Sequence, residues 1–187
     1  MELFDLLAAV AADLENARVT YALTGSIATS LYGRPQLSYD ADLVCRMTPQ
    51  QAESLAALWQ RRFYVSVDAL RDACENGGLA NVVDAASGWK VDLSVPPPEP
   101  YYLSAFSRRR RTALPGSSES IWVCSPEDAI LMKLLWRIES RSRKQFNDAL
   151  NVVESMGNRL DWEYLRDWAA RLGLAADLEE LRRAGVE

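Results

Sequence analysis

Apolar residues recur at every third or fourth position over residues 2–16, near the start of the chain. This spacing places them along one side of an amphipathic helix. Apolar and polar residues then alternate over residues 19–23 and 38–46, a period that predicts two strands, and residues 27–31 predict a short helix between them. Helices and strands in this order are typical of a sheet covered by helices.

The middle of the chain predicts another helix and a hairpin. Thr48 suits the N-cap of that helix, and Pro49 suits its first position. Residues 64–75 carry only a weak pattern. Residues 79–84 and 89–95 have the alternation of two strands joined by a short turn. The proline-rich stretch that follows, residues 96–100, favours a stiff extended linker.

From residue 125 onward the periodicity is helical throughout. Ser125 and Pro126 form a helix start, because the hydroxyl can cap the first turn and proline fits its first position. Helices are expected over residues 126–139, 142–156, 161–172 and 175–184, the last of them ended by Gly185. The sequence therefore predicts an α+β fold, with a sheet domain over residues 1–124 and a C-terminal helical domain over residues 125–187.

Composition excludes several classes of protein. The 187 residues are 49% hydrophobic and 25% charged, which excludes disordered and fibrous proteins. No apolar run approaches the roughly 20 residues of a membrane helix. The first residues lack the basic start and the cleavage site of a signal peptide, so we expect a cytoplasmic protein without a membrane partner. The three cysteines are widely spaced and odd in number, which argues for a reducing compartment and against a disulfide framework.

The chain has no histidine. That absence excludes Ser-His-Asp triads, Cys-His dyads and metal sites built on imidazole, so acid–base or metal chemistry must depend on carboxylates. The net charge of −5 argues against a protein that coats nucleic acid. However, nine basic and four acidic residues lie between residues 101 and 144, which leaves room for one phosphate-rich partner.

Two aspartates, Asp40 and Asp42, lie two positions apart on a predicted strand, so both carboxylates point to the same face. Neighbouring anions of this kind need a cation, and Mg²⁺ is typically held by one or two carboxylates together with substrate phosphates. Asp92, on the polar face of a later strand, would add a metal ligand or a base for an attacking hydroxyl. The alternative is a solvated strand face, with Asp92 paired to Lys90.

Gly25 and Ser26 stand where a strand ends and a helix begins. Backbone N–H groups at such a helix start, together with the Ser26 hydroxyl, can bind phosphate with help from the helix dipole. An ordinary turn is the alternative. Combined with the aspartates, this order of elements has the parts that phosphoryl transfer requires, namely positioning and charge neutralisation.

Residues 23–43, with the sequence LTGSIATSLYGRPQLSYDADL, resemble the signature of nucleotidyltransferases of the polymerase-β superfamily. The long spacing from Gly-Ser to Asp-x-Asp and the Tyr-Gly between them resemble the AbiEii/MenT-like branch, known as toxins of bacterial toxin–antitoxin and phage-defence systems. Residues 90–93 and 123–128 continue the similarity. The resemblance implies a nucleotidyltransferase-like mixed β-sheet with flanking helices, followed by a C-terminal helical bundle.

The resemblance also implies roles for individual residues. Asp40, Asp42 and Asp92 would be the catalytic and metal-binding acids, holding Mg²⁺ or Mn²⁺. The nucleoside triphosphate substrate would be bound by Gly25, Ser26, Lys133, Lys144 and Asp148. Both lysines fall on a basic stripe with Arg137 and Arg141, which would share one face if a single helix continued through residues 133–144. A solvated helix face is the alternative for that stripe.

A member of this branch would be a Mg²⁺-dependent nucleotidyltransferase that moves a nucleoside monophosphate to a hydroxyl of RNA, for instance the 3′ end of tRNA, or of a protein. Its role would be that of a toxin or a phage-defence component, with a cognate antitoxin as partner. The candidate RNA contacts are Arg108, Arg109, Arg110 and Arg111, because each neutralised phosphate adds salt-dependent affinity. The alternative for this run is a solvated loop or edge strand.

Two other functions remain open. Gln36 stands where the family commonly has an arginine, and Gln145 departs from the family's helical motif. Both fit a catalytically inactive binding or regulatory module of a toxin–antitoxin pair, although retention of all three acids favours an enzyme. The second alternative is a small-molecule nucleotidyltransferase such as an antibiotic-modifying enzyme. The arginine run favours a polyanionic acceptor over that.

Overall fold

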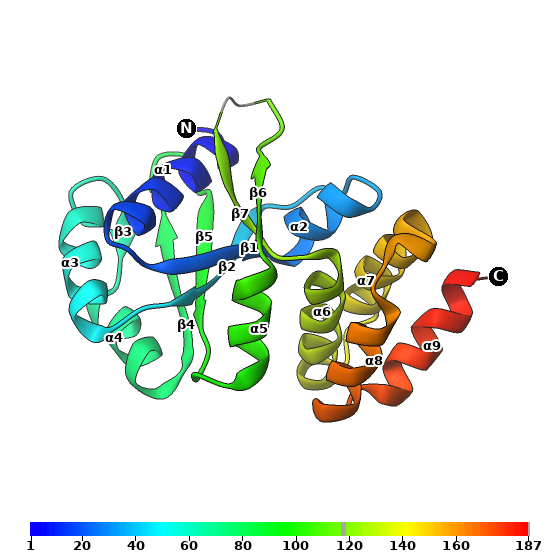
Figure 1. Ribbon diagram of the computed structural model, residues 1–187. Helices are drawn as coiled ribbons and strands as arrows, with labels where there is room; N and C mark the ends of the chain where they lie inside the picture. Colours follow the sequence, from blue (N-terminus) through cyan, green and yellow to red (C-terminus); the bar gives the residue numbers. More distant parts are fainter. Residues whose placement is uncertain (117–118, 187) are drawn as a thin grey trace. The chain divides into compact units, whose positions relative to one another are not determined.

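The computed structural model describes residues 1–116 and 119–186, and within them seven strands form one mixed sheet (Figure 1). The strands are β1 (Thr20–Thr24), β2 (Asp40–Arg46), β3 (Tyr64–Val65), β4 (Gly78–Val83), β5 (Lys90–Val95), β6 (Arg110–Ala113) and β7 (Ser120–Val123). Their order is β3-β4-β5-β2-β1-β7-β6. β2 pairs with β5 and β1 with β7 in parallel, whereas β3–β4, β4–β5 and β6–β7 are antiparallel. This mixed sheet confirms the predicted α+β class.

The described part of the chain has four helices that belong with the sheet: α1 (Leu3–Asn16), α3 (Pro49–Trp59), α4 (Val67–Asn76) and α5 (Pro100–Arg108). Helix α1 lies across the sheet and contacts β2, β5 and β7 (Figure 1). Its apolar stripe is fully buried, with Leu6, Leu7, Val10 and Leu14 at 0% exposure. Removing this apolar area from water is what fastens the helix to the sheet.

Helix α3 begins where the sequence predicts. The Thr48 hydroxyl accepts a hydrogen bond from the backbone N–H of Gln51 at 3.2 Å, and the Gln51 side chain accepts one from the Thr48 N–H at 2.9 Å. This capping box satisfies two backbone donors that have no partner within the helix. The Gln51 side chain also donates to the carbonyl of Ala17 at 2.9 Å, which joins the start of α3 to the end of α1.

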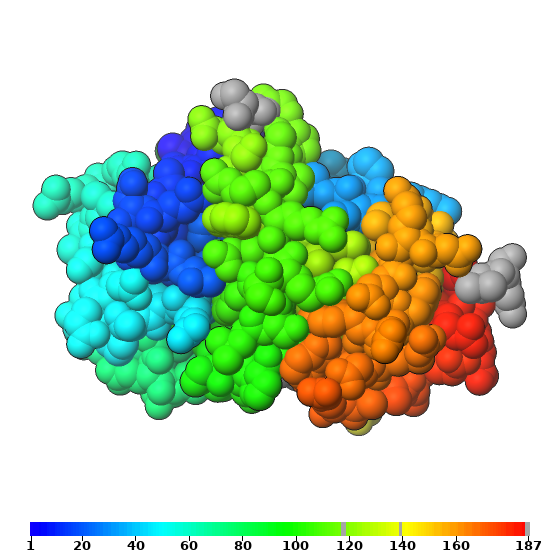
Figure 2. Space-filling view, in the orientation of Figure 1, coloured from blue at the N-terminus to red at the C-terminus, as the bar shows by residue number. Residues whose placement is uncertain are grey.

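The chain forms two compact units. The first consists of Met1–Leu23 and Ser38–Val123 and holds the sheet, and the second consists of Thr24–Leu37 and the chain from Cys124 onward. The second unit contains α2 (Gly25–Tyr32), α6 (Pro126–Ser140), α7 (Arg143–Met156), a 3₁₀ turn (Gly157–Arg159), α8 (Trp162–Arg171) and α9 (Ala175–Val186). Helix α6 packs against α2, α7 and α8. Figure 2 shows α8 and α9, in orange and red, on the outer surface of this unit.

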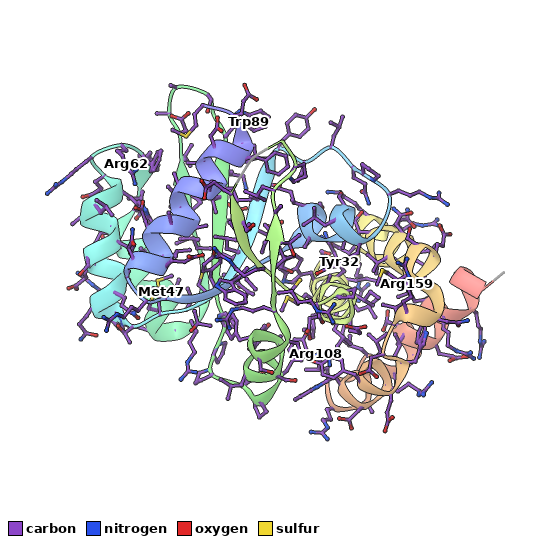
Figure 3. The ribbon with its side chains drawn as sticks, turned by 45° about the horizontal axis from the view of Figure 1, so that its top comes forward. Tyr32, Met47, Arg62, Trp89, Arg108 and Arg159 are labelled. Carbon is purple, nitrogen blue, oxygen red and sulfur yellow. The ribbon has the colours of Figure 1, made fainter. Side chains whose placement is uncertain are left out.

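Consecutive residues at the end of α2 fasten this helix to the rest of the second unit. The Tyr32 hydroxyl (labelled in Figure 3) donates to the backbone carbonyl of Cys124 at 2.7 Å. A Cβ added to Gly33 would lie 3.0 Å from the backbone of Asn151 in α7, so α2 approaches α7 more closely than a larger residue allows. The next residue, Arg34, forms an ion pair with α7 at 3.0 Å.

Most of the expected elements are confirmed, with exceptions in regions of weak pattern. Residues 64–75 form β3 and most of α4. The proline-rich linker is shorter than expected, because Pro100 occupies the first position of α5, where a missing N–H costs nothing. Gly185 does not end the last helix, since α9 continues to Val186. None of the helices in residues 1–116 and 119–186 has the length and apolar character needed to cross a membrane.

Gly33→Ala is expected to destabilise the protein. Because φ at Gly33 is −118°, outside the left-handed region that favours glycine, the cost arises from the added methyl group meeting the Asn151 backbone. Overpacking of this kind costs about 1–3 kcal/mol of unfolding free energy. Urea unfolding followed by circular dichroism measures the change, with the exposed Ser54→Ala as the control. An unchanged unfolding midpoint would contradict the close packing of α2 on α7.

Candidate functional site

The three predicted acids lie on the polar face of two neighbouring strands. β2 and β5 are parallel, and their register places Asp40 opposite Lys90 and Asp42 opposite Asp92. The alternate residues of β5 are apolar and buried. Their burial fixes the register, because a slip by one residue would turn them toward solvent. The acids are therefore direct neighbours across the two strands.

Lys90 is the cation between these acids. Its Nζ lies 2.5 Å from Oδ2 of Asp92 and 3.1 Å from Oδ2 of Asp40. Burial lowers the pKa of Lys90, but its hydrogen bonds to Asp92 and Asp40 outweigh that effect and raise the pKa above its ordinary value. The pair with Asp92 can be anticipated from the sequence. The contact with Asp40 cannot, because it depends on the register of strands about fifty residues apart.

The carboxylates fit a divalent cation that prefers oxygen ligands. Asp40 and Asp92 direct one oxygen each at a shared positive group, and carboxylate oxygens are the ligands that Mg²⁺ prefers. Within the part of the chain that the structure describes, no group of three acidic or cysteine side chains is arranged to hold a metal ion. The pair of Asp40 and Asp92 matches the one or two carboxylates by which Mg²⁺ is typically held together with water and substrate phosphates.

The second unit contains a polar cluster around Ser26. Lys133 and Lys144 donate from Nζ to the Ser26 hydroxyl oxygen at 3.2 and 3.3 Å. The Ser26 hydroxyl in turn donates to Oδ2 of Asp148 at 3.1 Å. The cluster combines side chains of α2, α6 and α7. Four of the residues predicted to bind nucleotide therefore meet at one point, and the fifth, Gly25, precedes Ser26 at the start of α2.

Burial separates the two lysines of this cluster. Lys133 and Asp148 form an ion pair at 2.8 Å, and both side chains are only 2% exposed. Charges removed from water in this way are stable only while both partners are present. Lys144, by contrast, is exposed. Lys133 is thus enclosed by the protein, and Lys144 is the lysine of this cluster that solvent reaches.

The start of α2 provides backbone donors beside the Ser26 hydroxyl. Gly25 has a φ of +68°, a left-handed conformation that glycine adopts without steric cost. The first N–H groups of a helix have no partner within it, and Thr24 makes no capping hydrogen bond through its side chain. N–H groups arranged in this way are suited to bind phosphate.

Two buried amide atoms of the second unit, Nε2 of Gln36 and Oε1 of Gln145, have no hydrogen-bond partner among the described residues. A buried polar atom without a partner costs about 1–3 kcal/mol. Gln145 lies three residues before Asp148, so both project from the same side of α7. Both glutamines stand out in the sequence as departures from the pattern of the family that residues 23–43 resemble, but the burial of these two atoms is visible only in the structure.

The basic stripe expected over residues 133–144 is interrupted, because the single helix that it requires does not form. Helix α6 ends at Ser140, and Arg141 takes a left-handed conformation with φ +51° that turns the chain before α7. Arg137 pairs with two acidic residues of α9 at 3.2 and 3.1 Å. Only the two lysines of the stripe contact Ser26.

The arginine run occupies the end of α5 and the edge strand β6. Arg108 (labelled in Figure 3) and Arg109 are half-buried, whereas Arg110 and Arg111 are exposed. The guanidinium groups of Arg109 and Arg111 lie over the ring of Trp122, at 4.5 and 5.5 Å from its centroid. Charged side chains on an edge strand also discourage pairing with another chain.

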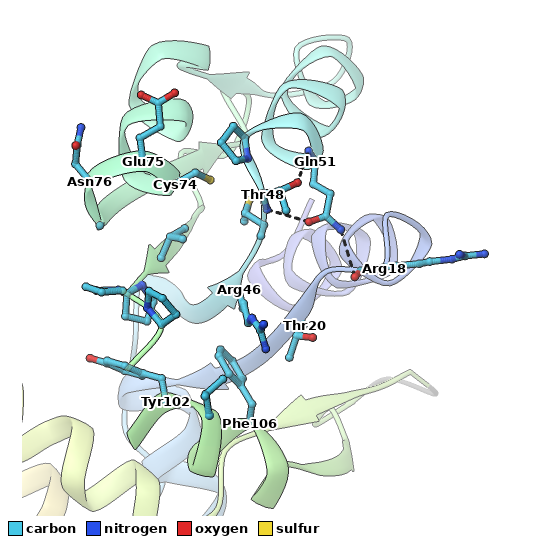
Figure 4. Close-up of a pocket in the computed structure, with 18 residues that line it drawn as sticks. Arg18, Thr20, Arg46, Thr48, Gln51, Cys74, Glu75, Asn76, Tyr102 and Phe106 are labelled. Atoms are coloured by element: carbon cyan, nitrogen blue, oxygen red, sulfur yellow. Dashed lines mark hydrogen bonds between the residues drawn. The ribbon is translucent and has the colours of Figure 1, made fainter. Parts of the chain in front are cut away.

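A pocket of about 530 Å³ lies in the first unit (Figure 4). It lies at the C-terminal ends of β2 and β5, whereas the acids lie nearer the N-terminal ends of these strands. Figure 4 shows the Arg46 side chain directed into it from the end of β2. Figure 3 marks the two ends of these strands, with Trp89 before β5 and Met47 after β2. At about 3.3 Å per residue, Arg46 lies about 13 Å along β2 from Asp42. The pocket is therefore too distant to hold a group that reacts at the acids.

The cysteines offer no nucleophile. Cys45 and Cys124 are buried, and burial raises the pKa of both thiols. Cys74 is half-buried, and the same effect raises its pKa. Because the thiolate is the reactive form, none of these side chains is activated.

Comparison with known proteins identifies the fold. No protein-family model matches the chain, and no curated protein does. Among solved structures, an antigenic nucleotidyltransferase-like protein from Paracoccidioides brasiliensis is 18% identical with a TM-score of 0.57, over 98% of this chain and 93% of that one. The antibiotic-resistance factor ANT(2″)-Ia is 15% identical with a TM-score of 0.57, over 96% and 97%. A putative nucleotidyltransferase from Thermotoga maritima is 18% identical with a TM-score of 0.50, over 78% and 92%.

These similarities establish a nucleotidyltransferase-like fold, with a mixed sheet, flanking helices and C-terminal helices. The fold that the resemblance of residues 23–43 implies is therefore confirmed.

Lys133→Met is expected to lower the free energy of unfolding by about 3–5 kcal/mol, because it leaves the Asp148 carboxylate as a buried charge without its main partner. Urea unfolding measures the loss. The double variant Lys133→Met/Asp148→Leu should recover much of it, since apolar side chains can replace a buried ion pair at little cost. A single variant as stable as the wild type would contradict the buried pair.

Proposed function

We propose that this protein is a metal-dependent nucleotidyltransferase, which transfers a nucleoside monophosphate from a nucleoside triphosphate to a hydroxyl group. The observation that carries the proposal is the register of β2 and β5, which sets Asp42 opposite Asp92. Carboxylates concentrated on one face of a sheet repel one another unless cations accompany them. The fold supports the proposal, because solved structures described as a nucleotidyltransferase-like protein and a putative nucleotidyltransferase share it.

The acids of the first unit would serve the transfer itself. Asp40, Asp42 and Asp92 would hold Mg²⁺ or Mn²⁺, which supplies charge neutralisation at the triphosphate. The acceptor oxygen forms a bond to the α-phosphorus, while the bond from that phosphorus to the oxygen that bridges to the β-phosphate breaks. Asp92 accepts the proton of the acceptor hydroxyl, and pyrophosphate leaves.

Residues of the second unit would bind the triphosphate. Lys144 is exposed and can donate to a phosphate oxygen, and Gly25 and Ser26 provide backbone and hydroxyl donors at a helix start. The buried pair of Lys133 and Asp148 orients the Ser26 hydroxyl through hydrogen bonds on both sides. Oε1 of Gln145, on the same side of α7 as Asp148, is an acceptor without a partner among the described residues, and it suits a hydroxyl or amino group of the nucleotide rather than its phosphates.

For the acceptor we propose RNA, in the first place the 3′ end of tRNA, with a protein hydroxyl as the other option. This follows the resemblance of residues 23–43 to the AbiEii/MenT-like branch, which also implies a toxin or phage-defence role and a cognate antitoxin as partner. The edge strand β6 supports RNA, because Arg110 is an exposed cation there; Arg111 is also exposed but is already paired with Glu15.

A small-molecule acceptor is the second candidate. One observation favours it: the fold is shared with ANT(2″)-Ia, an antibiotic-resistance factor whose structure is also solved with adenylyl-2″-tobramycin. An aminoglycoside and RNA are both rich in hydroxyl groups, so each offers the acceptor that the transfer requires.

Transfer of label from α-³²P nucleoside triphosphates to total tRNA in the presence of Mg²⁺ tests the activity. We expect transfer by the wild type and none by Asp40→Asn/Asp42→Asn. Asp92→Asn should lower the rate by about 10²–10⁴-fold, the usual contribution of a general base. The exposed acid of α4, Asp72, provides the control Asp72→Asn, which should retain the wild-type rate.

Parallel reactions with total protein and with an aminoglycoside identify the acceptor class. Label on the aminoglycoside alone would replace the RNA proposal with the small-molecule one. Equal background signals from the wild type and the variants with every nucleotide would contradict the proposed transferase activity and favour an inactive regulatory module.

Arg110→Gln is expected to weaken the binding of tRNA by a similar factor whatever the RNA sequence. If Arg110 neutralises one phosphate, the slope of log affinity against log salt concentration should fall by about 1. Fluorescence anisotropy at several salt concentrations measures the slope. Arg71→Gln removes the same charge from an ion pair with Glu53 on another part of the first unit, and it should leave the slope unchanged. Equal slopes for all three proteins would exclude Arg110 as a contact.

A further inference from the structure

Lys90, the first residue of β5, binds the two oxygens that a metal ion would need. Its Nζ lies 3.1 Å from Oδ2 of Asp40 and 2.5 Å from Oδ2 of Asp92. These carboxylates come from different strands, and both are proposed above as metal ligands. The ammonium group therefore occupies the point where the two carboxylates converge.

An ammonium group and a divalent cation cannot share that point. Mg²⁺ approaches carboxylate oxygens to about 2.0–2.1 Å, and it would use the same lone pairs of Oδ2 that now accept hydrogen bonds from Lys90. The two positive groups would also repel each other at such close range. A metal ion that binds both Asp40 and Asp92 thus requires Lys90 to move away.

Lys90 is free to move, and the acids are held without it. Its side chain is 37% exposed and has a flexible four-carbon stem, so it can turn toward solvent. The Ser38 hydroxyl lies 2.9 Å from the backbone carbonyl oxygen of Asp40 and 3.1 Å from its Oδ1, so this contact holds Asp40 without involving Lys90. The strand register keeps Asp92 in place whatever the position of the lysine.

We propose that Lys90 is a displaceable counter-cation of the metal site, which neutralises Asp40 and Asp92 in the metal-free protein and competes with the metal ion for them. The inference rests on the proposed function, because it takes these acids as metal ligands. Its consequence is weak metal binding by the free protein. A metal ion that arrives with a triphosphate has the advantage, since phosphate oxygens offer the released ammonium group new anionic partners.

Mn²⁺ binding by the full chain without nucleotide tests the proposal. Electron paramagnetic resonance of free Mn²⁺ gives the dissociation constant for the wild type and for Lys90→Gln. The affinity of Lys90→Gln should be roughly tenfold higher, because the competing charge has been removed. The control Arg71→Gln removes one positive charge from an ion pair with Glu53, and it should stay within about twofold of the wild type at moderate ionic strength.

The outcomes separate this inference from the proposed function. Mn²⁺ affinity that is equal or lower in Lys90→Gln than in the wild type overturns the role of Lys90 and leaves the metal site standing. Absence of Mn²⁺ binding in both proteins, with and without a nucleoside triphosphate, overturns the metal site itself and the inference with it.

A measurement on the wild type does not depend on whether the variant folds. The chain has only three lysines, so selective ¹³C-lysine labelling yields few side-chain resonances, and Lys90→Arg identifies the one from Lys90. Titration with Mg²⁺ should shift the Lys90 resonance as the ammonium group leaves the carboxylates. A resonance that stays fixed while Mg²⁺ binds would overturn the proposal.

Discussion

Carboxylates at facing positions of adjacent strands repel one another, and the polar side of this sheet is arranged around that repulsion. Asp42 and Asp92 cannot slide apart, because the buried apolar residues on the other side of β5 fix the register. Packing of the core thus confines negative charge to one place. A positive group nearby relieves the repulsion, and Lys90 is such a group.

The two units balance charge in opposite ways. In the first, the cation is partly exposed and can be exchanged for another. In the second, Lys133 and Asp148 are removed from water, and neither can be removed without leaving the other as a buried charge that lacks its ion-pair partner. The buried pair acts as a fixed support for Ser26, whereas the partly exposed Lys90 marks a place where cations can be exchanged. Similar residue types therefore have different uses, and solvent access decides which.

The sequence predicts local structure well where capping residues and periodicity agree, as at Thr48 and Pro49. It also predicts that Asp40 and Asp42 share a face, because that follows from the two-residue period of a strand. It does not predict that Asp42 faces Asp92 across the two strands, since strand pairing joins distant segments and depends on the whole core. The break at Arg141 is invisible for another reason: a left-handed residue that is not glycine carries no compositional mark. Burial of one side-chain amide atom each of Gln36 and Gln145 is likewise a property of tertiary packing.

The path of the chain between the two units has a consequence for how such a protein can be divided. The chain leaves the first unit after Leu23, returns at Ser38 and leaves again after Val123. A fragment that stops at Val123 would keep α2 but lose α6 and α7, the helices against which α2 packs. The complementary fragment would keep Lys133 and lose the serine to which it donates. Neither unit is a module that a single genetic cut could separate, so gene fusion or loss would have to preserve both together.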